Sequence, residues 1–384
     1  MTGRPRVIIV YRPGADLPLQ VVTGIYGWIA DHDTWDVVHL VNDDRAAADV
    51  EAMDSVDGAI IIGPSSHTES LLKRPGLPCV VVLGDPLDPF RPLVAVDEDQ
   101  LCNDALDEFA SLGVPRVATM AYNPTRRTHT FADAAALRKL PCASFGVAHE
   151  ESAKFWPQRH AILADWLLSL ETPVGVLAHA SPMARDLAAA AQMAGLSVPD
   201  DVVIISVEGD EVHCRACLPP LTAMRVDAER MGRISAGLLS RRMKGEKVDE
   251  RVLIPPTGVD RRESSDVLNI PDPQLSRAIR TLRDVATDES PIEITLKDAG
   301  VSRSQLEYGM RRYLGRTPYE EVMRVRLEKA CDLLRDSSLE LSAVAETSGF
   351  GTLSNFCKVF KRRLQVTPRD YRLGRELPEV AASN

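Results

Sequence analysis

The chain lacks the features of membrane, secreted and disulfide-stabilised proteins. No apolar run approaches the roughly 18 residues that a membrane-spanning helix needs. The apolar run near the first residue is too short for a secretory signal. The seven cysteines are odd in number and irregularly spaced, which argues against a disulfide framework and favours a reducing compartment. We therefore expect a cytoplasmic protein with no membrane partner.

The sequence also lacks the short motifs of common enzymes. It contains neither of the glycine-rich phosphate-binding patterns, G-x-G-x-x-G and G-x-x-x-x-G-K-[ST]. It contains no G-x-S-x-G nucleophile elbow and no H-E-x-x-H zinc motif. Cys214 and Cys217 have a metal-like spacing, but a structural zinc site needs a second such pair, so we interpret them as packing residues. The sequence therefore predicts no enzyme activity, no metal site and no cofactor.

What the chain does have is length and an uneven distribution of charge. Its 384 residues suggest two or three domains. The net charge is −10, yet residues 276–372 hold 18 basic and 14 acidic side chains. A mildly basic C-terminal quarter on an acidic body is typical of a nucleic-acid-binding segment attached to another domain.

The first two thirds of the chain alternate between short apolar runs and longer amphipathic ones. The candidate strands are Val7–Tyr11, Asp36–Leu40, Gly58–Ile62, Cys79–Leu83, Arg116–Ala121, Ser144–Ala148, Val174–Ala178 and Val202–Val207. The candidate helices are Gln20–Ala30, Ala46–Met53, Leu101–Ser111, Ala132–Leu140, Arg159–Leu170, Ala184–Ala194 and Ala228–Met243. This alternation predicts an α/β fold with parallel sheets covered on both faces. About 260 residues exceed one comfortable core, which favours two lobes.

Polar residues that follow the candidate strands form a candidate small-molecule site. Ligands of such sheets bind outside the carboxyl ends of the strands. The residues predicted there, with Arg127 as a further neighbour, are Arg12, Ser65, Asp85, Arg126, His179 and Glu208. Charged groups of both signs with hydroxyls suit a polyhydroxylated ligand, although any such loop is polar where water covers it.

Three segments resemble the sensor domain of lac-repressor-type regulators: residues 112–118, 188–211 and 219–224. The resemblance implies a two-lobed, periplasmic-binding-protein-like (type I) domain over residues 1–265, with an effector bound between the lobes. Family members usually carry Asp where Glu208 stands, and Asn or Asp where Gly209 stands. They also carry a helix-turn-helix before the first strand, where this sequence has only five residues before Arg6.

The last hundred residues contain a repeat with a period of 50. Each copy has a glycine turn, a hydroxyl residue that can cap a helix, and an apolar pair four residues apart. The paired positions are Gly300 with Gly349, Ser302 with Thr352, Leu306 with Phe356, and Met310 with Phe360. The pattern predicts two helix-turn-helix motifs joined by a helix over Tyr319–Arg335, with the apolar pairs in the core.

This repeat resembles the AraC-type DNA-binding domain, which implies such a domain over residues 273–374. The resemblance rests on residues 300–306, 314–318, 326–330, 344–350, 356–361 and 367–372. Residues 266–272 are predicted to be a linker and residues 375–384 a disordered tail. The first motif departs from the family pattern at Tyr308–Met310, and Gly309 within the recognition helix costs about 1 kcal/mol relative to Ala.

The two resemblances together imply an activator of sugar catabolism that binds a double-stranded DNA operator. They imply a homodimer, recruitment of RNA polymerase, and a small-sugar effector such as D-xylose. The residues predicted to contact DNA are Arg303, Ser304, Gln305, Glu307, Tyr308, Arg311, Thr352, Leu353, Ser354, Asn355, Lys358, Lys361 and Arg362. Three alternatives stay open at this point: a regulator with another effector or none, a sugar-transport binding protein, and an enzyme.

Overall fold

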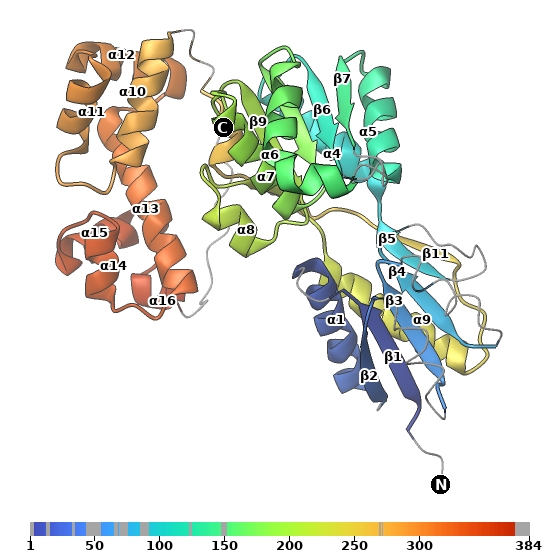
Figure 1. Ribbon diagram of the computed structural model, residues 1–384. Helices are drawn as coiled ribbons and strands as arrows, with labels where there is room; N and C mark the ends of the chain where they lie inside the picture. Colours follow the sequence, from blue (N-terminus) through green and yellow to red (C-terminus); the bar gives the residue numbers. More distant parts are fainter. Residues whose placement is uncertain are drawn as a thin grey trace. The chain divides into compact units, whose positions relative to one another are not determined.

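The structure is a computed structural model in which the chain forms two compact units, residues 1–267 and 268–384 (Figure 1). The described residues are 4–12, 16–32, 35–43, 55–64, 68, 76–84, 92–122, 125–146, 152–268, 270 and 272–372. The predicted helix Ala46–Met53 and the predicted tail 375–384 lie outside them. Among the described residues, no helix combines the length and the apolar content that crossing a bilayer requires.

The first lobe of unit 1 is built on a six-stranded parallel sheet. Its strands, in spatial order, are β11 (Arg251–Ile254), β5 (Leu93–Val96), β4 (Cys79–Val82), β3 (Gly58–Ile62), β1 (Arg6–Tyr11) and β2 (Asp36–Val41). Every residue of β3 and β4 is buried, as continuous apolar runs in the middle of a parallel sheet should be. Two helices, α1 (Asp16–His32) and α9 (Ala228–Met243), supply side chains to the same core.

The second lobe repeats this design. Its strands, in spatial order, are β12 (Gly258–Asp260), β10 (Thr222–Arg225), β9 (Val202–Val207), β8 (Val174–Ala178), β6 (Val117–Met120) and β7 (Cys142–Phe145). Its helices are α4 (Glu98–Ser111), α5 (Arg126–Leu137), α6 (Ser152–Leu168), α7 (Ser181–Met193) and α8 (Glu211–Ala216), with a short 3-10 turn at Glu263–Ser265. The predicted α/β fold with two sheets is confirmed.

Some strands were not predicted, and another was misplaced. The candidate strands do not include the short strands β5, β10, β11 and β12, which have three or four residues each. Strand β7 begins two residues before the predicted position, because Val117 of β6 pairs with Cys142. Strand β12 runs antiparallel to β10, which differs from the all-parallel prediction.

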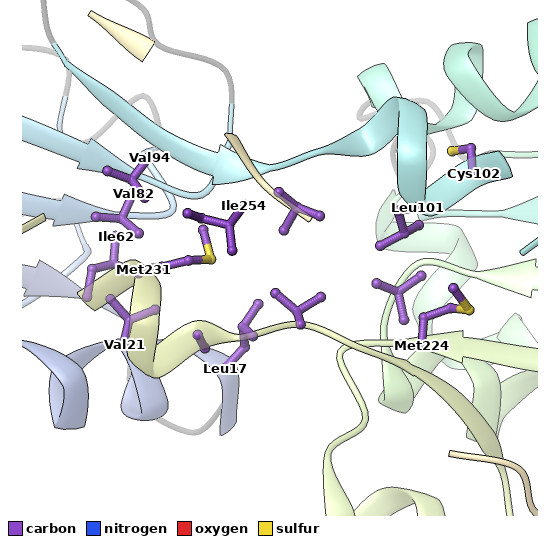
Figure 2. Close-up of a cluster of buried hydrophobic side chains, with 14 of the residues drawn as sticks. Leu17, Val21, Ile62, Val82, Val94, Leu101, Cys102, Met224, Met231 and Ile254 are labelled. Atoms are coloured by element: carbon purple, nitrogen blue, oxygen red, sulfur yellow. The ribbon is translucent and has the colours of Figure 1, made fainter. Parts of the chain in front are cut away.

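The chain crosses between the lobes three times, from β5 to α4, from β10 to α9 and from β11 to β12. Two backbone hydrogen bonds tie these crossings together: Asp97 N–H donates to Ile254, and Thr257 N–H donates to Arg225. One hydrophobic cluster extends along them and includes Val21 on α1, Met231 on α9 and Leu101 on α4 (Figure 2). The three crossings are therefore held to one another by backbone hydrogen bonds and lie against this hydrophobic cluster.

Unit 2 is entirely helical where it is described. Its helices are α10 (Pro273–Asp284), α11 (Pro291–Ala299), α12 (Arg303–Leu314), α13 (Pro318–Asp336), α14 (Leu341–Thr347), α15 (Leu353–Leu364) and α16 (Pro368–Arg372). The predicted core residues Leu306, Met310, Phe356 and Phe360 have no exposed surface, so that prediction is confirmed. Two residues of the predicted linker, Leu268 and Ile270, are buried in this same core, so the chain is anchored in unit 2 before α10 begins.

Candidate nucleic-acid interface and effector site

The first helix-turn-helix motif consists of α11, a turn at Gly300 and α12. Gly300 has a φ of 64°, a left-handed conformation that glycine adopts without strain. The Ser302 hydroxyl accepts a hydrogen bond from the Gln305 N–H at 3.2 Å, and Gln305 Oε1 accepts one from the Ser302 N–H at 2.9 Å. This reciprocal cap fixes where α12 starts.

The second motif consists of α14, a turn at Gly349 and α15. The Thr352 hydroxyl accepts a hydrogen bond from the Asn355 N–H at 3.3 Å, so both predicted capping residues cap their helices. The Asn355 side chain donates to the Phe350 carbonyl at 3.1 Å. This second bond attaches the start of α15 to the turn before it.

All the residues predicted to contact DNA are exposed and lie on, or cap, α12 and α15. Several of them also make bonds within the domain. Gln305 and Asn355 serve the caps, and Arg303 pairs with Glu293 of α11 at 2.9 Å. The structure thus makes the set accessible, and DNA contact by each residue remains a prediction.

Sequence reasoning missed Arg312, which is exposed on α12 one turn after Tyr308. Its guanidinium donates to the Tyr308 hydroxyl at 3.3 Å. The spacing of four residues was the available signal, since side chains at i and i+4 are neighbours on a helix. Arg312 therefore joins Tyr308 as a candidate DNA contact.

Gly309 has a structural reason to stand inside α12. It is buried, and a Cβ atom at this position would lie 2.2 Å from a terminal methyl carbon of Leu275 on α10. The glycine allows α10 and α12 to pack closely, which offsets its unfavourable helix propensity.

The predicted effector residues follow strands at two switch points of the sheets. In the first sheet β1 lies between β2 and β3, and in the second β6 lies between β7 and β8. The strand order therefore reverses at β1 and at β6, and ligands of such sheets bind outside the carboxyl ends of the strands at these points. Arg12 follows β1 and is exposed, and Arg126 follows β6 and is exposed. Ser65 and Asp85 lie outside the described residues.

The neighbouring arginines Arg126 and Arg127 have different environments. They occupy the first turn of α5, which begins earlier than predicted because Thr125 caps it. Arg127 donates to both carboxylate oxygens of Glu98, at 2.7 and 3.0 Å, and to the His179 carbonyl at 2.9 Å. Burial alone would lower the pKa of Arg127, but Glu98 raises it overall. Arg127 thus links the first residue of α4 to the segment after β8, while Arg126 is open to solvent.

His179 is buried and faces the second lobe itself. Its Nε2 atom lies 2.8 Å from the Thr119 hydroxyl, and its Nδ1 atom lies 3.3 Å from the Thr125 hydroxyl. Burial and the positive charge of Arg127 lower the pKa of the imidazole to about 3. The neutral ring therefore has a protein partner at each nitrogen, and direct effector contact by His179 remains a prediction.

Glu208 lies directly after β9 and is half-buried, with a φ of 84°. This left-handed conformation is unusual for a residue with a side chain and occurs mainly where a site requires it. The negative charge of Glu208 also contributes to the raised pKa of Arg127. Glu208 is therefore close enough to Arg127 for their charges to interact at the carboxyl ends of the strands.

Two family models match the chain. A model described as a periplasmic binding protein-like domain matches residues 106–265, and a model described as a helix-turn-helix domain matches residues 296–374. The chain is a transcription regulator that combines a periplasmic-binding-protein-like sensor domain with an AraC-type helix-turn-helix domain. Both resemblances drawn from the sequence are thus confirmed.

Relatives of this AraC-type regulator match it along nearly its whole length. The xylose operon regulatory protein of Escherichia coli (strain K12) is 26% identical over 97% of this chain and 97% of its own length. The protein of that name from Haemophilus influenzae is 24% identical over 96% of this chain and 98% of its own. Sensor and DNA-binding domain therefore occur in the same order in these proteins.

Solved structures share the fold. That of a xylose-binding transcription activator matches with a TM-score of 0.78 at 24% identity, covering 97% of this chain and 99% of the other. That of the lac repressor dimer bound to operator and anti-inducer matches with a TM-score of 0.56 at 17% identity, covering 69% of this chain and 82% of the other. The second match covers only part of the regulator.

Cys214 and Cys217 of the regulator are both buried in the core of the second lobe. Burial raises the pKa of each thiol. In the described part of the chain, no group of three or more metal-binding side chains includes them. Buried thiols with raised pKa values are poor nucleophiles and poor metal ligands, which supports the interpretation as packing residues.

Proposed function

We propose that this regulator activates a sugar-catabolic operon when a small sugar such as D-xylose binds between the lobes of its sensor. The observation that carries the proposal is the joint similarity of both domains, in one order, to regulatory proteins of the xylose operon. We further propose that it acts in the cytoplasm as a homodimer that binds a double-stranded operator, recruits RNA polymerase and catalyses no reaction.

The side chains at the switch points suit a polyhydroxylated ligand. Arg12 and Arg126 are exposed guanidinium groups from different lobes, and Glu208 is a half-buried carboxylate. Charged groups of both signs make short hydrogen bonds to the adjacent hydroxyls of a sugar. The Arg127–Glu98 pair would keep the first turns of α4 and α5 in place for this binding. Ser65 and Asp85 complete the proposed set from the first lobe.

A second candidate function is regulation by a non-sugar effector. Gly209 offers no side-chain contact, and both Glu208 and Gly209 have positive φ angles. Lac-repressor-type sensors usually carry Asp where Glu208 stands, so the longer carboxylate reaches a different point in the site. This departure favours a ligand that differs from the sugars of the resembling sensors.

Thermal unfolding of the full chain with a panel of ligands tests the proposal. The panel contains D-xylose, other pentoses and hexoses, sugar acids and sugar phosphates. A ligand at 100 times its dissociation constant stabilises its binding domain by about 2.7 kcal/mol, a clear rise in melting temperature. A selective rise with a neutral sugar supports the first candidate, whereas a rise only with an acid or phosphate supports the second. No rise with any sugar would contradict sugar sensing.

A further inference from the structure

The turn of the second helix-turn-helix motif touches the turn that precedes the first motif. The turn between α10 and α11, residues 285–290, belongs to the first half of the domain, and Gly349 belongs to the second. A Cβ atom on Gly349 would lie 2.7 Å from both Cα and the carbonyl oxygen of Thr287. Gly349 also has a φ of 78°, so this position is closed to a side chain by both space and conformation.

Arg326, in the middle of α13, binds the same turn, residues 285–290, through two hydrogen bonds. Its Nε donates to the Ala286 carbonyl at 2.7 Å, and its Nη2 donates to the Asp288 carbonyl at 2.7 Å. A planar guanidinium that donates to two carbonyls fixes their relative position, which an ammonium cannot do. The Cβ position of Gly349 also lies 2.9 Å from Arg326 Nε, so α13 and both halves of the domain meet here.

This contact reaches both recognition helices. Ala286 has no exposed surface and shares a hydrophobic cluster with Leu306 and Met310 of α12. On the other side, the residue after Gly349 is Phe350, whose carbonyl accepts the hydrogen bond from Asn355 of α15. A shift of the contact would therefore move one recognition helix relative to the other.

The corresponding glycine of the first motif has no such role. Gly300 also has a positive φ, but a Cβ atom there would meet nothing closer than the Gln274 side-chain nitrogen at 3.6 Å. The repeat thus uses its two turn glycines differently. Gly300 only completes a turn, whereas Gly349 also packs against Thr287 in the other half of the domain.

We propose that Arg326 and Gly349 are positioning residues that set the distance and angle between α12 and α15. They thereby determine the spacing that the protein accepts between its two DNA boxes, the operator segments that α12 and α15 each contact. The inference rests on the proposed operator binding. Helix α13 joins the motifs covalently, but a single helix of 19 residues can bend, and the contact at Thr287 gives the second attachment that makes their separation fixed.

The test compares DNA affinities at native and altered spacing. The wild-type full chain first selects its binding sites from a random duplex library. Duplexes are then made with two base pairs inserted between the boxes, which rotates one box by roughly 70° around the helix axis. Fluorescence anisotropy measures both duplexes with the wild type, Arg326→Ala, Arg326→Lys, Gly349→Ala and the matched control Gly300→Ala.

We expect the insertion to weaken wild-type binding by about tenfold or more, comparable to a mismatched base pair. The ratio of the affinity for the native duplex to that for the lengthened duplex should fall below about threefold in Arg326→Ala and Gly349→Ala. This affinity ratio should be intermediate in Arg326→Lys and stay at the wild-type value in Gly300→Ala. General destabilisation would weaken both duplexes equally and leave the ratio unchanged. If Gly349→Ala does not fold, the two Arg326 variants decide.

Two failures can be told apart. Selection of no sequence by the wild type would contradict operator binding itself. Selection of a two-box site, with a wild-type ratio in folded Arg326→Ala, would leave operator binding in place and overturn the positioning role.

Discussion

Glu321 Oε1 accepts a hydrogen bond from Arg283 Nε at 2.6 Å, although the carboxylate has no exposed surface. Arg324 donates to the same oxygen at 2.7 Å, and Arg316 pairs with the other oxygen. Burial would raise the pKa of this carboxyl, but the three guanidinium groups lower it to about 2. One buried charge therefore connects α10, the turn after α12, and α13.

Replacing Glu321 with Gln should destabilise the helical domain strongly. The change leaves three arginines without their shared carboxylate, and removal of one partner of a buried ion pair costs about 3 kcal/mol or more. Because Arg316 and Arg324 are about one-third exposed, we expect the lower end of this range. Urea unfolding monitored by circular dichroism measures the change.

Glu328→Gln is the matched control for that experiment. Glu328 pairs with the same Arg324 at 2.6 Å but lies at the surface. Exposed pairs contribute about 1 kcal/mol or less. Equal losses in the two variants would contradict the role given to Glu321.

Gly309→Ala should destabilise the protein, although alanine is the better helix former. Its Cβ would collide with Leu275, and overpacking of this kind costs about 1–3 kcal/mol. Urea unfolding of the single variants and of the double variant with Leu275→Ala forms a double-mutant cycle. We expect the second change to recover part of the loss, and strict additivity would contradict the packing explanation.

The stability of the sensor should fall as the pH falls from about 6.5 towards 3. The unfolded chain binds a proton at His179 below its ordinary pKa of 6.5, whereas the folded chain binds it only near pH 3. Each pH unit in this window costs up to about 1.4 kcal/mol. Urea unfolding at pH 7 and 5 should show a smaller difference in His179→Gln than in the wild type. The same difference in both would refute the assignment.

Alanine substitution should affect the stability of the sensor at Arg127 and its response to the effector at Arg126. Arg127→Ala leaves Glu98 without its bidentate partner and should lower the melting temperature of the sensor. Arg126→Ala should leave the melting temperature of the free sensor unchanged but weaken the rise in melting temperature that the effector causes. We expect the same two results for Asp85→Ala and Glu208→Ala. A normal shift in all three would place the effector site elsewhere.

Lys358→Ala should weaken operator binding. If Lys358 contacts a phosphate, the slope of log affinity against log salt should fall by about 0.9. Lys244→Ala, which removes an exposed charge from the sensor domain, is the control. Equal salt slopes and affinities for the wild type and Lys358→Ala would remove this residue from the interface.

Sequence alone determined the features that depend on neighbouring residues. Caps at Ser302 and Thr352, the i and i+4 core pairs and the alternation of strands and helices all follow from local propensity and periodicity, which the printed sequence displays directly. For this reason the repeat and most helices were predicted, and the family resemblance built on them is confirmed.

The tertiary structure decided which polar residues are buried and what they hold. Arg126 and Arg127 are adjacent and chemically identical, yet only packing against Glu98 buries one of them. In the sequence, Glu321 stands among charged residues that are typical of an exposed helix face. In the structure it is buried and pairs with Arg283, which is 38 residues away in the chain. Such pairings join segments distant in the chain, and local sequence carries no signal for them because burial depends on the whole fold.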